Sequence, residues 1–531
     1  MAMDPLSLLL PSTSRPFTVA TVGTAPSKPT GLAGARIPLP RRRSWRPRAA
    51  GRLPAVSAVA RKADEASVSS EERFDWLDQW YPFAPVGDLD PRAPHGKTVL
   101  GLNVVAWYDH AGAGEWRVFA DACPHRLAPL SEGRIDGKGR LQCVYHGWCF
   151  DGAGACRFVP QAPAHGPPVH KNGRACVASY PCVVQNNVLW FYPRTEAEFR
   201  DVLQRKRPPF FAEMDDPSFF TVFGVRDLPY GYGTMMENIL DPAHVPYAHK
   251  GMVLFSTEED PGRYVPDPKC HDREGGNPIK MKIQQANIDG FLSRMKRGDM
   301  KFVAPCTLHG TNPGKVNGEA EPWFMYVVFC VPVSPGRSRL IWLWPRNSGI
   351  WLRKITPQWY SHMLVNRILD SDAYLLHVQE RNFAAAGLDK WHRACYVPTS
   401  SDAMVVAFRN WFRKYCKNQI VWATPQPQAD HQLRPIQTMD KLLERYWSHV
   451  VQCRSCSAAL KAMRGLEVAL QVASVAAIGF LAVAKGTPAM SVVQRAAAVA
   501  AAVLCFAASR WLAGFIENNF FVAAPYVHAD K

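Results

Sequence analysis

Acidic residues are almost missing from the start of the chain: between Met1 and Lys62 a single acid, Asp4, stands against eleven Lys and Arg. This stretch also lacks the compact apolar core and small-residue cleavage site of a secretory signal. Its Ser, Thr, Pro, Ala and Arg are typical of an organellar transit peptide, which we predict for residues 1–60. Because much of the net charge of +17 lies here, the basic balance gives no reason to propose nucleic-acid binding.

Paired cysteines are also scarce. The 14 cysteines are scattered over 531 residues, and Cys453 and Cys456 form the one Cys-x-x-Cys pair. A secreted disulfide framework is therefore excluded, and thiols in a reducing compartment become metal ligands, redox groups or buried apolar residues. What the chain does contain is ample core material, with 17 Trp and 26 Phe, which excludes wholesale disorder. Its 531 residues are enough for two or three domains.

A small all-β domain is predicted for residues 74–195. Short β-like runs occur between Gly and Asp turns at 99–107, 116–119, 141–145 and 188–191. Cys123-Pro124-His125 and Cys143-Val144-Tyr145-His146 lie within this region. Each motif offers one thiolate and one imidazole, which is the ligand set of a Rieske [2Fe–2S] cluster. A Cys2His2 zinc site is the alternative, but zinc fingers pair like ligands, which these motifs do not.

An α+β domain is predicted for residues 210–450, because strand-like runs at 219–223, 324–330 and 340–344 precede a helical pattern at 359–381. Its candidate metal site lies in the stretch from Glu237 to His249. His244 and His249 are five positions apart and would diverge on an ideal helix, but Pro246 favours a bend that turns both rings to one point. Two histidines that are satisfied at a helix end are the alternative.

Two further features of this stretch bear on the site. Asp241-Pro242 resembles an N-cap followed by proline at the first helical position. Two imidazoles and a carboxylate suit ferrous iron with open coordination positions. For the carboxylate, Asp370 and Asp372 on the predicted helix are both candidates, and chemistry alone does not choose between them.

The two Cys/His motifs, joined to Asn238-x-x-Asp241-x-x-His244-x-x-x-x-His249, resemble the Rieske-type non-haem iron oxygenases. The resemblance implies an all-β Rieske domain followed by a helix-grip-like catalytic domain, with a mononuclear iron held by His244, His249 and Asp372. It also implies a head-to-tail homotrimer, in which Asp241 links a cluster-ligating His of one subunit to His244 of the next. Asn238 and Asp241 are the residues that the resemblance makes catalytic.

Two apolar segments, about 466–484 and 496–516, end the chain. Each is near the minimum length for a bilayer span, so we predict a two-helix transmembrane hairpin within 466–516. A buried helical hairpin in a soluble protein is the alternative. The pair at 453–456 has three interpretations: a redox dithiol that thioredoxin can address, a zinc half-site, or inert thiols. The lack of a second Cys-x-x-Cys disfavours zinc.

This tail and the motif Asp241-Pro-Ala-His-Val-Pro-Tyr-Ala-His249 resemble the plant pheophorbide a oxygenase-like subgroup, and most of all its protochlorophyllide-dependent translocon component. The resemblance implies a chlorophyll-type tetrapyrrole substrate, O2, and ferredoxin as electron donor. It implies a chloroplast membrane, with the inner envelope favoured over the thylakoid and the catalytic domain in the stroma. It also supports a redox role for Cys453 and Cys456, with thioredoxin and import translocon subunits as partners.

Overall fold

The computed structural model describes residues 72–249, 252, 279–295, 298–311, 315–316, 319–320, 325–347, 351, 355–424, 435–484 and 490–522. The chain divides into two units, Met1–Ser69 and Ser70–Lys531. The predicted transit peptide of residues 1–60 lies outside the described residues. Everything below concerns the second unit.

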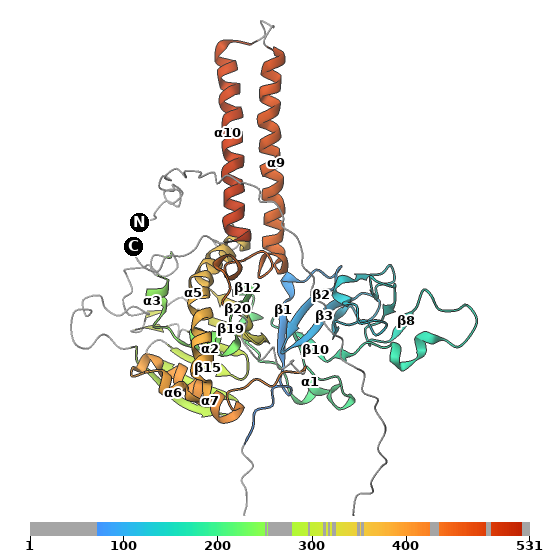
Figure 1. Cartoon of the computed structure of the whole chain (residues 1–531), viewed down its shortest axis with the longest axis vertical. Coiled ribbons are helices and arrows are strands. Elements are labelled where there is room, and N and C mark those ends of the chain that lie inside the picture. Colours follow the sequence, from blue (N-terminus) through green and yellow to red (C-terminus); the bar gives the residue numbers. More distant parts are fainter. Residues whose placement is uncertain are drawn as a thin grey trace, which may run out of the picture. The chain divides into compact units, whose positions relative to one another are not determined.

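The first part of this unit consists of three small antiparallel sheets (Figure 1). One sheet has the order β2 (His95–Val99), β3 (Leu102–Asp109), β4 (Glu115–Ala120), β9 (Ser179–Tyr180). The second has the order β5 (Arg134–Ile135), β6 (Leu141–Gln142), β7 (Cys149–Phe150), β8 (Cys156–Phe158). The third has the order β1 (Tyr81–Pro85), β11 (Val188–Phe191), β10 (Cys182–Gln185). The predicted all-β fold is confirmed.

Two of the predicted strands are shorter in the structure. The run at 99–107 is broken by a turn in which Leu100 and Gly101 adopt φ angles of 50° and 80°. The run at 141–145 ends after Gln142, because Cys143 begins a tight turn that Gly147 closes by donating its N–H to the Cys143 carbonyl at 3.0 Å. Turns of this kind are not visible in the pattern of apolar residues alone.

The second part is built on a seven-stranded antiparallel sheet. Its strand order is β12 (Phe220–Leu228), β20 (Arg337–Arg346), β19 (Met325–Ser334), β16 (Thr307–Thr311), β15 (Gly298–Val303), β14 (Gly290–Met295), β13 (Met281–Asn287). A separate pair is formed by β17 (Lys315–Val316) and β18 (Glu319–Ala320). The helices of this part are α1 (Val202–Arg205), α2 (Tyr232–Leu240), α3 (Val245–Ala248), α5 (Gln358–Ala386), α6 (Trp391–Ala394), α7 (Ala403–Cys416) and α8 (Met439–Leu442).

Helices α2 and α5 position the candidate site, and their sequences explain why. In α2, Tyr232, Met236 and Leu240 are buried at helical spacing, so one face of the helix packs into the core. Helix α5 covers the predicted 359–381 and continues to Ala386, where Gly387 with φ 83° ends it. Charged and polar residues in the middle of α5 are buried as well, which an ordinary surface helix would not allow.

The two parts share one hydrophobic core, to which both the β1 sheet and the seven-stranded sheet contribute buried residues. Leu100 and Gly101 also donate their N–H groups to the carbonyls of Pro332 and Val333, at 2.7 and 2.9 Å. A second core surrounds Cys123 and Cys143 and includes Trp107, Phe119 and Leu141. The loops that carry the Cys/His motifs thus rest on a core of their own.

The chain ends in two long helices, α9 (Arg454–Val483) and α10 (Val492–Ile516), which run side by side (Figure 1). Both are long and apolar enough to cross a membrane. Large apolar side chains such as Val475, Phe480 and Leu504 are more than half exposed. Within the described part of the chain nothing covers these apolar faces, so the hairpin is not buried in the core of this chain.

Candidate metal centres

The two Cys/His motifs form a matched pair of tight turns. The Cys123 carbonyl accepts the N–H of Leu127 at 2.7 Å, and the Cys143 carbonyl accepts that of Gly147 at 3.0 Å. Leu127 and Gly147 both have positive φ angles, 58° and 75°. Each turn therefore reverses the backbone shortly after its cysteine.

The side chains of these turns fit a [2Fe–2S] cluster. The His125 and His146 rings lie 4.5 Å apart between centroids, and Trp148 stacks on His125 at 4.7 Å. The buried Nδ1 of His125 has no hydrogen-bond partner among the described residues, as expected of an atom that binds a metal. Burial raises the pKa of the Cys123 thiol to about 12, a cost that iron ligation of the thiolate would offset.

The nearby thiols of Cys149 and Cys156 have other partners. Cys149 Sγ lies 3.3 Å from the Gly147 carbonyl, and Cys156 Sγ lies 3.7 Å from that of Phe158. Both are buried in strands of the small sheet. Cys156 also belongs to the core beneath the cluster loops, so both thiols have structural contacts.

The second centre is built where α2 ends. Helix α2 stops at Leu240, and α3 begins only at Val245, so the predicted N-cap role of Asp241 is wrong. Instead, Asp241 Oδ1 accepts the N–H of Ala243 at 2.8 Å and stabilises the turn between the helices. Pro246 falls in the first turn of α3, where its missing N–H costs nothing.

His244, His249 and Asp372 come together at this turn. His244 and His249 flank the single turn of α3, and Asp372 reaches them from α5. Asp372 Oδ2 lies 3.8 Å from His244 Nε2 and 3.6 Å from His249 Nε2. The three donor atoms all lie within 4.8 Å of one another, so one ion can bind all three.

Hydrogen bonds fix both rings with Nε2 facing Asp372. His244 Nδ1 donates to the Asp241 carbonyl at 2.5 Å, and His249 Nδ1 donates to Ser371 Oγ at 2.8 Å. Ser371 in turn donates its hydroxyl to the Ile368 carbonyl at 2.7 Å. In a neutral ring held in this way, Nε2 is the nitrogen that carries the lone pair, which is the state that a metal ligand requires. This donor set fits ferrous iron and leaves coordination positions open.

Asn238 lies at the same centre. Its Nδ2 is 3.2 Å from His244 Nε2 and donates to Asp372 Oδ2 at 3.3 Å. The sequence motif predicted Asn238 as a site residue but did not predict where its amide lies. In the structure this amide contacts two of the three candidate ligands and can hold both in place.

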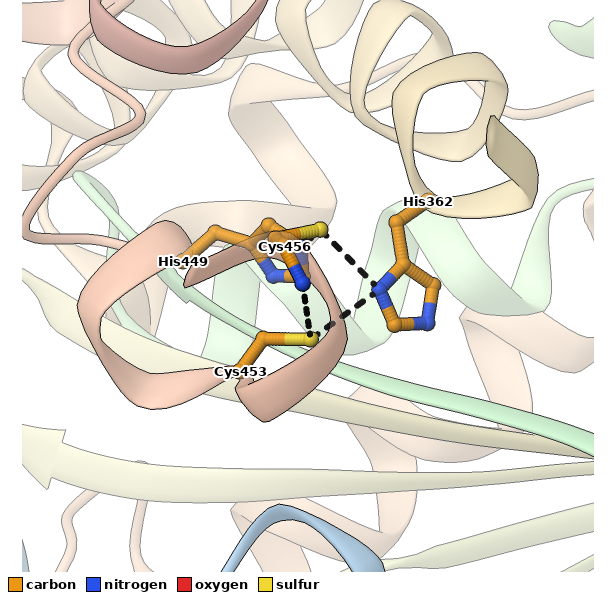
Figure 2. A group of neighbouring side chains, drawn as sticks. All are labelled: His362, His449, Cys453 and Cys456. Atoms are coloured by element: carbon orange, nitrogen blue, oxygen red, sulfur yellow. Dashed lines mark hydrogen bonds between the residues drawn. The ribbon is translucent and has the colours of Figure 1, made fainter. Parts of the chain in front are cut away.

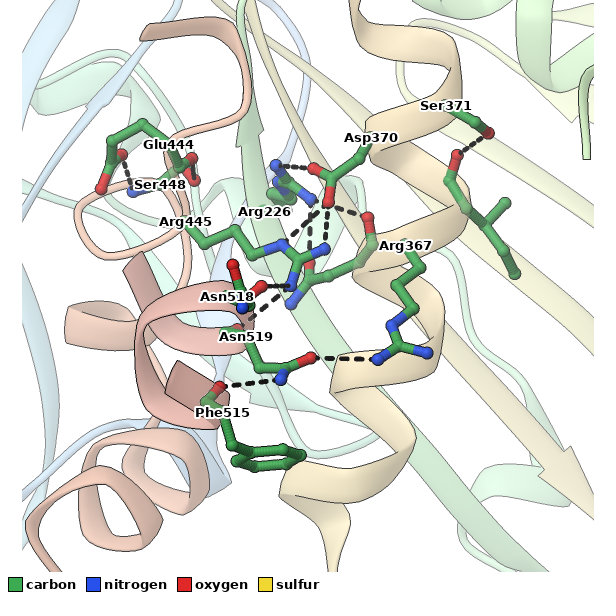
Figure 3. Close-up of polar contacts among 12 residues, drawn as sticks. Arg226, Arg367, Asp370, Ser371, Glu444, Arg445, Ser448, Phe515, Asn518 and Asn519 are labelled. Atoms are coloured by element: carbon green, nitrogen blue, oxygen red, sulfur yellow. Dashed lines mark hydrogen bonds and ion pairs between the residues drawn. The ribbon is translucent and has the colours of Figure 1, made fainter. Parts of the chain in front are cut away.

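Asp370, the alternative third ligand, belongs to a different cluster (Figure 3). Its Oδ1 accepts Arg226 Nη2 at 2.5 Å, and its Oδ2 accepts Arg445 Nε at 2.8 Å. Arg445 also donates to the carbonyls of Asn518 and Asn519, at 3.1 and 3.2 Å. Asp370 thus joins α5 to the segment that follows α10, and Asp372 is the carboxylate that faces the histidines.

Cys453 and Cys456 lie in a buried group that sequence reasoning did not find. His362 of α5 and His449 surround the two thiols (Figure 2). The spacing His449-x-x-x-Cys453-x-x-Cys456 was a signal for one of these histidines. His362 lies 91 residues before Cys453, and only the fold brings the two together.

Comparisons with known proteins agree with both centres. A model described as "Rieske [2Fe-2S] domain" matches residues 79–181, and one described as "Pheophorbide a oxygenase" matches residues 302–390. The fold resembles dicamba monooxygenase bound to 3,6-dichlorosalicylic acid, with a TM-score of 0.51, 20% identity, and coverage of 64% of this chain and 98% of that chain. At this identity the likeness concerns the fold alone.

Relatives of known function match most of the chain. Protochlorophyllide-dependent translocon component 52 of Arabidopsis thaliana is 45% identical over 85% of each chain. Flavonoid 8-hydroxylase 2 of Ocimum basilicum is 42% identical over 92% of each chain. Pheophorbide a oxygenase of Oryza sativa subsp. japonica is 34% identical over 95% of each chain. The chain therefore belongs to the pheophorbide a oxygenase-like family of Rieske non-haem iron monooxygenases.

Proposed function

We propose that this monooxygenase hydroxylates a chlorophyll-type tetrapyrrole, with protochlorophyllide a as the preferred substrate and reduced ferredoxin as electron donor. The observation that carries the proposal is the 45% identity to the protochlorophyllide-dependent translocon component. In the balanced reaction, one substrate C–H bond, O2, two electrons and two protons give a C–OH bond and one water. Ferredoxin supplies the electrons one at a time.

Each residue of the two centres has a role in this reaction. Cys123, His125, Cys143 and His146 hold the [2Fe–2S] cluster, and His244, His249 and Asp372 hold the iron. When bound, the cluster supplies single electrons and the iron supplies the O2 chemistry. Asn238 positions the ligands His244 and Asp372 through its amide. Ser371 and the Asp241 carbonyl keep Nε2 of each histidine unprotonated.

Asp241 is the proposed bridge between subunits of a homotrimer. Its Oδ2 lies 3.7 Å from His244 Nδ1, and its side chain is 31% exposed. The carboxylate therefore contacts an iron ligand on one side and is open to another group on the other. In the trimer that group is a cluster-ligating histidine of the neighbouring subunit.

The proposed location is the chloroplast inner envelope, with the thylakoid membrane as the alternative. Relatives named above are chloroplastic, and α9 and α10 are apolar helices long enough to span a bilayer. Because α9 begins and α10 ends beside the catalytic domain, a two-pass hairpin keeps that domain on one side, the stroma. Import translocon subunits remain proposed partners.

Two rival substrates have specific support. Pheophorbide a is named for one relative, and a flavonoid is named for another that is 42% identical. A redox-sensing translocon subunit is the rival from another class. The complete donor set of the iron site argues against it, because a sensor needs no second metal.

The deciding experiment supplies the purified full-length chain with reduced ferredoxin and isotopically labelled O2. Protochlorophyllide a, pheophorbide a and a flavone are offered in separate reactions, and product masses are measured. We expect one labelled oxygen atom in a tetrapyrrole product and none with Asp372→Asn. If label entered the flavone product and neither tetrapyrrole product, the chain would be a flavonoid hydroxylase. No turnover by a chain with both metal centres loaded would favour the sensor.

A further inference from the structure

Four buried side chains that belong to neither centre described above meet near the start of α9 (Figure 2). They are His362, His449, Cys453 and Cys456, and each is at most 3% exposed. His362 Nδ1 lies 3.3 Å from Cys453 Sγ and 3.4 Å from Cys456 Sγ. His449 Nε2 lies 3.2 Å from Cys456 Sγ. Two thiols and two imidazole nitrogens therefore share one small space.

The remaining nitrogen of each ring is held by the backbone of β12. His362 Nε2 donates to the Phe223 carbonyl and His449 Nδ1 donates to the Val225 carbonyl, each at 2.6 Å. A ring nitrogen that donates to a carbonyl is protonated, so the other nitrogen of each neutral ring carries a lone pair. Both lone pairs therefore face the sulfur atoms. Metal-binding histidines are held by backbone carbonyls or carboxylates in the same way.

We propose that His362, His449, Cys453 and Cys456 bind one structural zinc ion. Cys2His2 with tetrahedral geometry is a common donor set of structural zinc sites. Zinc bonds of about 2.0–2.3 Å imply donor–donor distances of about 3.3–3.8 Å, and the three S–N distances above are close to this range. Two thiolates also neutralise the charge of Zn²⁺, so the buried site carries no net charge of its own.

The geometry fits a single ion better than a cluster. All four donor atoms lie within 4.8 Å of one another, a condition that the four Rieske ligands do not meet among the described residues. In a Rieske centre the cysteines bind one iron and the histidines the other, which spreads the donors. Here His362 Nδ1 is equally close to both sulfur atoms.

The same geometry disfavours the dithiol predicted from the sequence. Reactive cysteines are partly exposed. Cys453 and Cys456 are 0% and 3% exposed. Thioredoxin could reach these sulfur atoms only after the base of the hairpin had opened.

A zinc ion here would tie the hairpin to the catalytic domain. Cys453 and Cys456 belong to the start of α9, and His362 belongs to α5, the helix that also carries Asp372. The first N–H of α9, on Arg454, is accepted by Asp88 Oδ1 at 3.2 Å. The site therefore joins the Rieske part, α5 and the hairpin at one point.

The test begins with the full-length chain purified in detergent and dialysed against EDTA. Metal analysis by mass spectrometry should find about one zinc and three iron atoms per chain, the iron belonging to the cluster and the mononuclear site. X-ray absorption at the zinc edge should show two Zn–S bonds of about 2.3 Å and two Zn–N bonds of about 2.0 Å. This readout is specific to zinc and does not depend on activity.

Variants then assign the ligands. Cys453→Ser should lose the zinc but keep acid-labile sulfide and the Rieske spectrum. Cys330→Ser is the matched control, because Cys330 is also 0% exposed but lies outside the site, and it should keep the zinc. If Cys453→Ser does not fold, the absorption spectrum of the wild-type chain decides alone.

Three results would overturn the proposal. One is an isolated chain without zinc in which Cys453 and Cys456 form a disulfide. Another is zinc bound only by oxygen and nitrogen, or retained in full by Cys453→Ser. The third is a fourth iron atom in place of zinc, which would assign a different ion. None of these results affects the proposed hydroxylation, which is tested by product mass.

Discussion

Asp370 and Asp372 are two positions apart on α5, and both are buried, yet their surroundings differ completely. Asp370 is neutralised by Arg226 and Arg445, whereas Asp372 faces two histidines and an amide. Both oxygens of Asp370 are thus taken up by arginine contacts, and their hydrogen-bond partners among the described residues include no histidine. The pair therefore offers an internal control for the iron site.

We expect Asp372→Asn to lose the mononuclear iron and at least 100-fold in turnover while its unfolding temperature stays close to that of the wild type. Asp370→Asn should instead lower the unfolding temperature, because it leaves two buried arginines uncompensated. The expected loss in the free energy of unfolding is about 3–5 kcal/mol. The folded fraction of Asp370→Asn should keep its iron. Thermal unfolding and iron analysis distinguish the two, and iron loss from Asp370→Asn alone would reassign the ligand.

A second prediction concerns Asp241. Asp241→Asn preserves the turn, because its amide oxygen can accept the Ala243 N–H, but it removes the negative charge beside His244. Both metals should stay bound while most of the turnover is lost. Activity near that of the wild type would show that Asp241 is no bridge.

A third prediction concerns the pH dependence of stability. Lys97 points its Nζ inward to Gln452 Oε1 at 2.5 Å, and burial, with Arg339 nearby, lowers its pKa from 10.5 to about 7. Asp227 and Asp88 oppose this shift. Above pH 7 the folded chain has lost this proton while the unfolded chain keeps it up to about pH 10.5, so a rise in pH from 7 to 9 favours folding.

Lys97→Met removes this effect. The unfolding temperature of the wild type should therefore rise relative to that of Lys97→Met as the pH increases from 7 to 9. The difference should decrease again as the pH falls through 7. Scanning fluorimetry of both proteins in the same detergent measures the difference. Parallel curves over this range would mean that Lys97 keeps an ordinary pKa.

At this scale, sequence reasoning found the residues that lie in short motifs and missed those that depend on the fold. Both Cys/His loops and the two histidines around Pro246 were visible because local spacing carries the chemistry. Asp372 lies 134 residues from Asn238. Asp370 and Asp372 were both candidates on the predicted helix, and only the resemblance chose Asp372. His362 was missed because its neighbours in the sequence form no motif that links it to Cys453 and Cys456.

At the scale of elements, the long helices and central strands were predictable and the turns were not. The helix predicted at 359–381 and the strands at 324–330 and 340–344 appear with longer bounds. The turns at Leu100 and Cys143 depend on positive φ angles and backbone hydrogen bonds, which apolar patterns do not encode. The order of strands in the large sheet could not be predicted either, because it also depends on backbone hydrogen bonds that apolar patterns do not encode.

The hairpin permits a test of membrane insertion. Val475 of α9 and Leu504 of α10 lie near the middle of the apolar segments 466–484 and 496–516, and they are 71% and 68% exposed. Changing both to Lys should cost about 2.5–3.5 kcal/mol each at the centre of a bilayer. The variant should leave the membrane fraction on flotation after alkaline extraction. Tyr396→Lys, at a position that is 90% exposed in the catalytic part, should float with the wild type.

At the scale of the whole molecule, the proposed trimer makes a prediction that no single chain can satisfy. A Cys143→Ser chain lacks the cluster and an Asp372→Asn chain lacks the iron, so each alone should be inactive. Co-expressed in one cell, they should recover activity, because a cluster in one subunit can serve the iron of the next. Failure of mixed assemblies to recover activity would place the electron path within one chain.

The buried middle of α5 limits how this protein can vary in length. His362 and Asp372 are ten positions apart on one continuous helix, which sets them about 15 Å apart along its axis. Inserting or deleting one residue between them would turn one end of the helix by about 100° relative to the other. Either His362 would then leave the cysteines or Asp372 would leave the histidines. Relatives that keep both groups should therefore show no insertions or deletions between these positions, whatever happens in the loops outside.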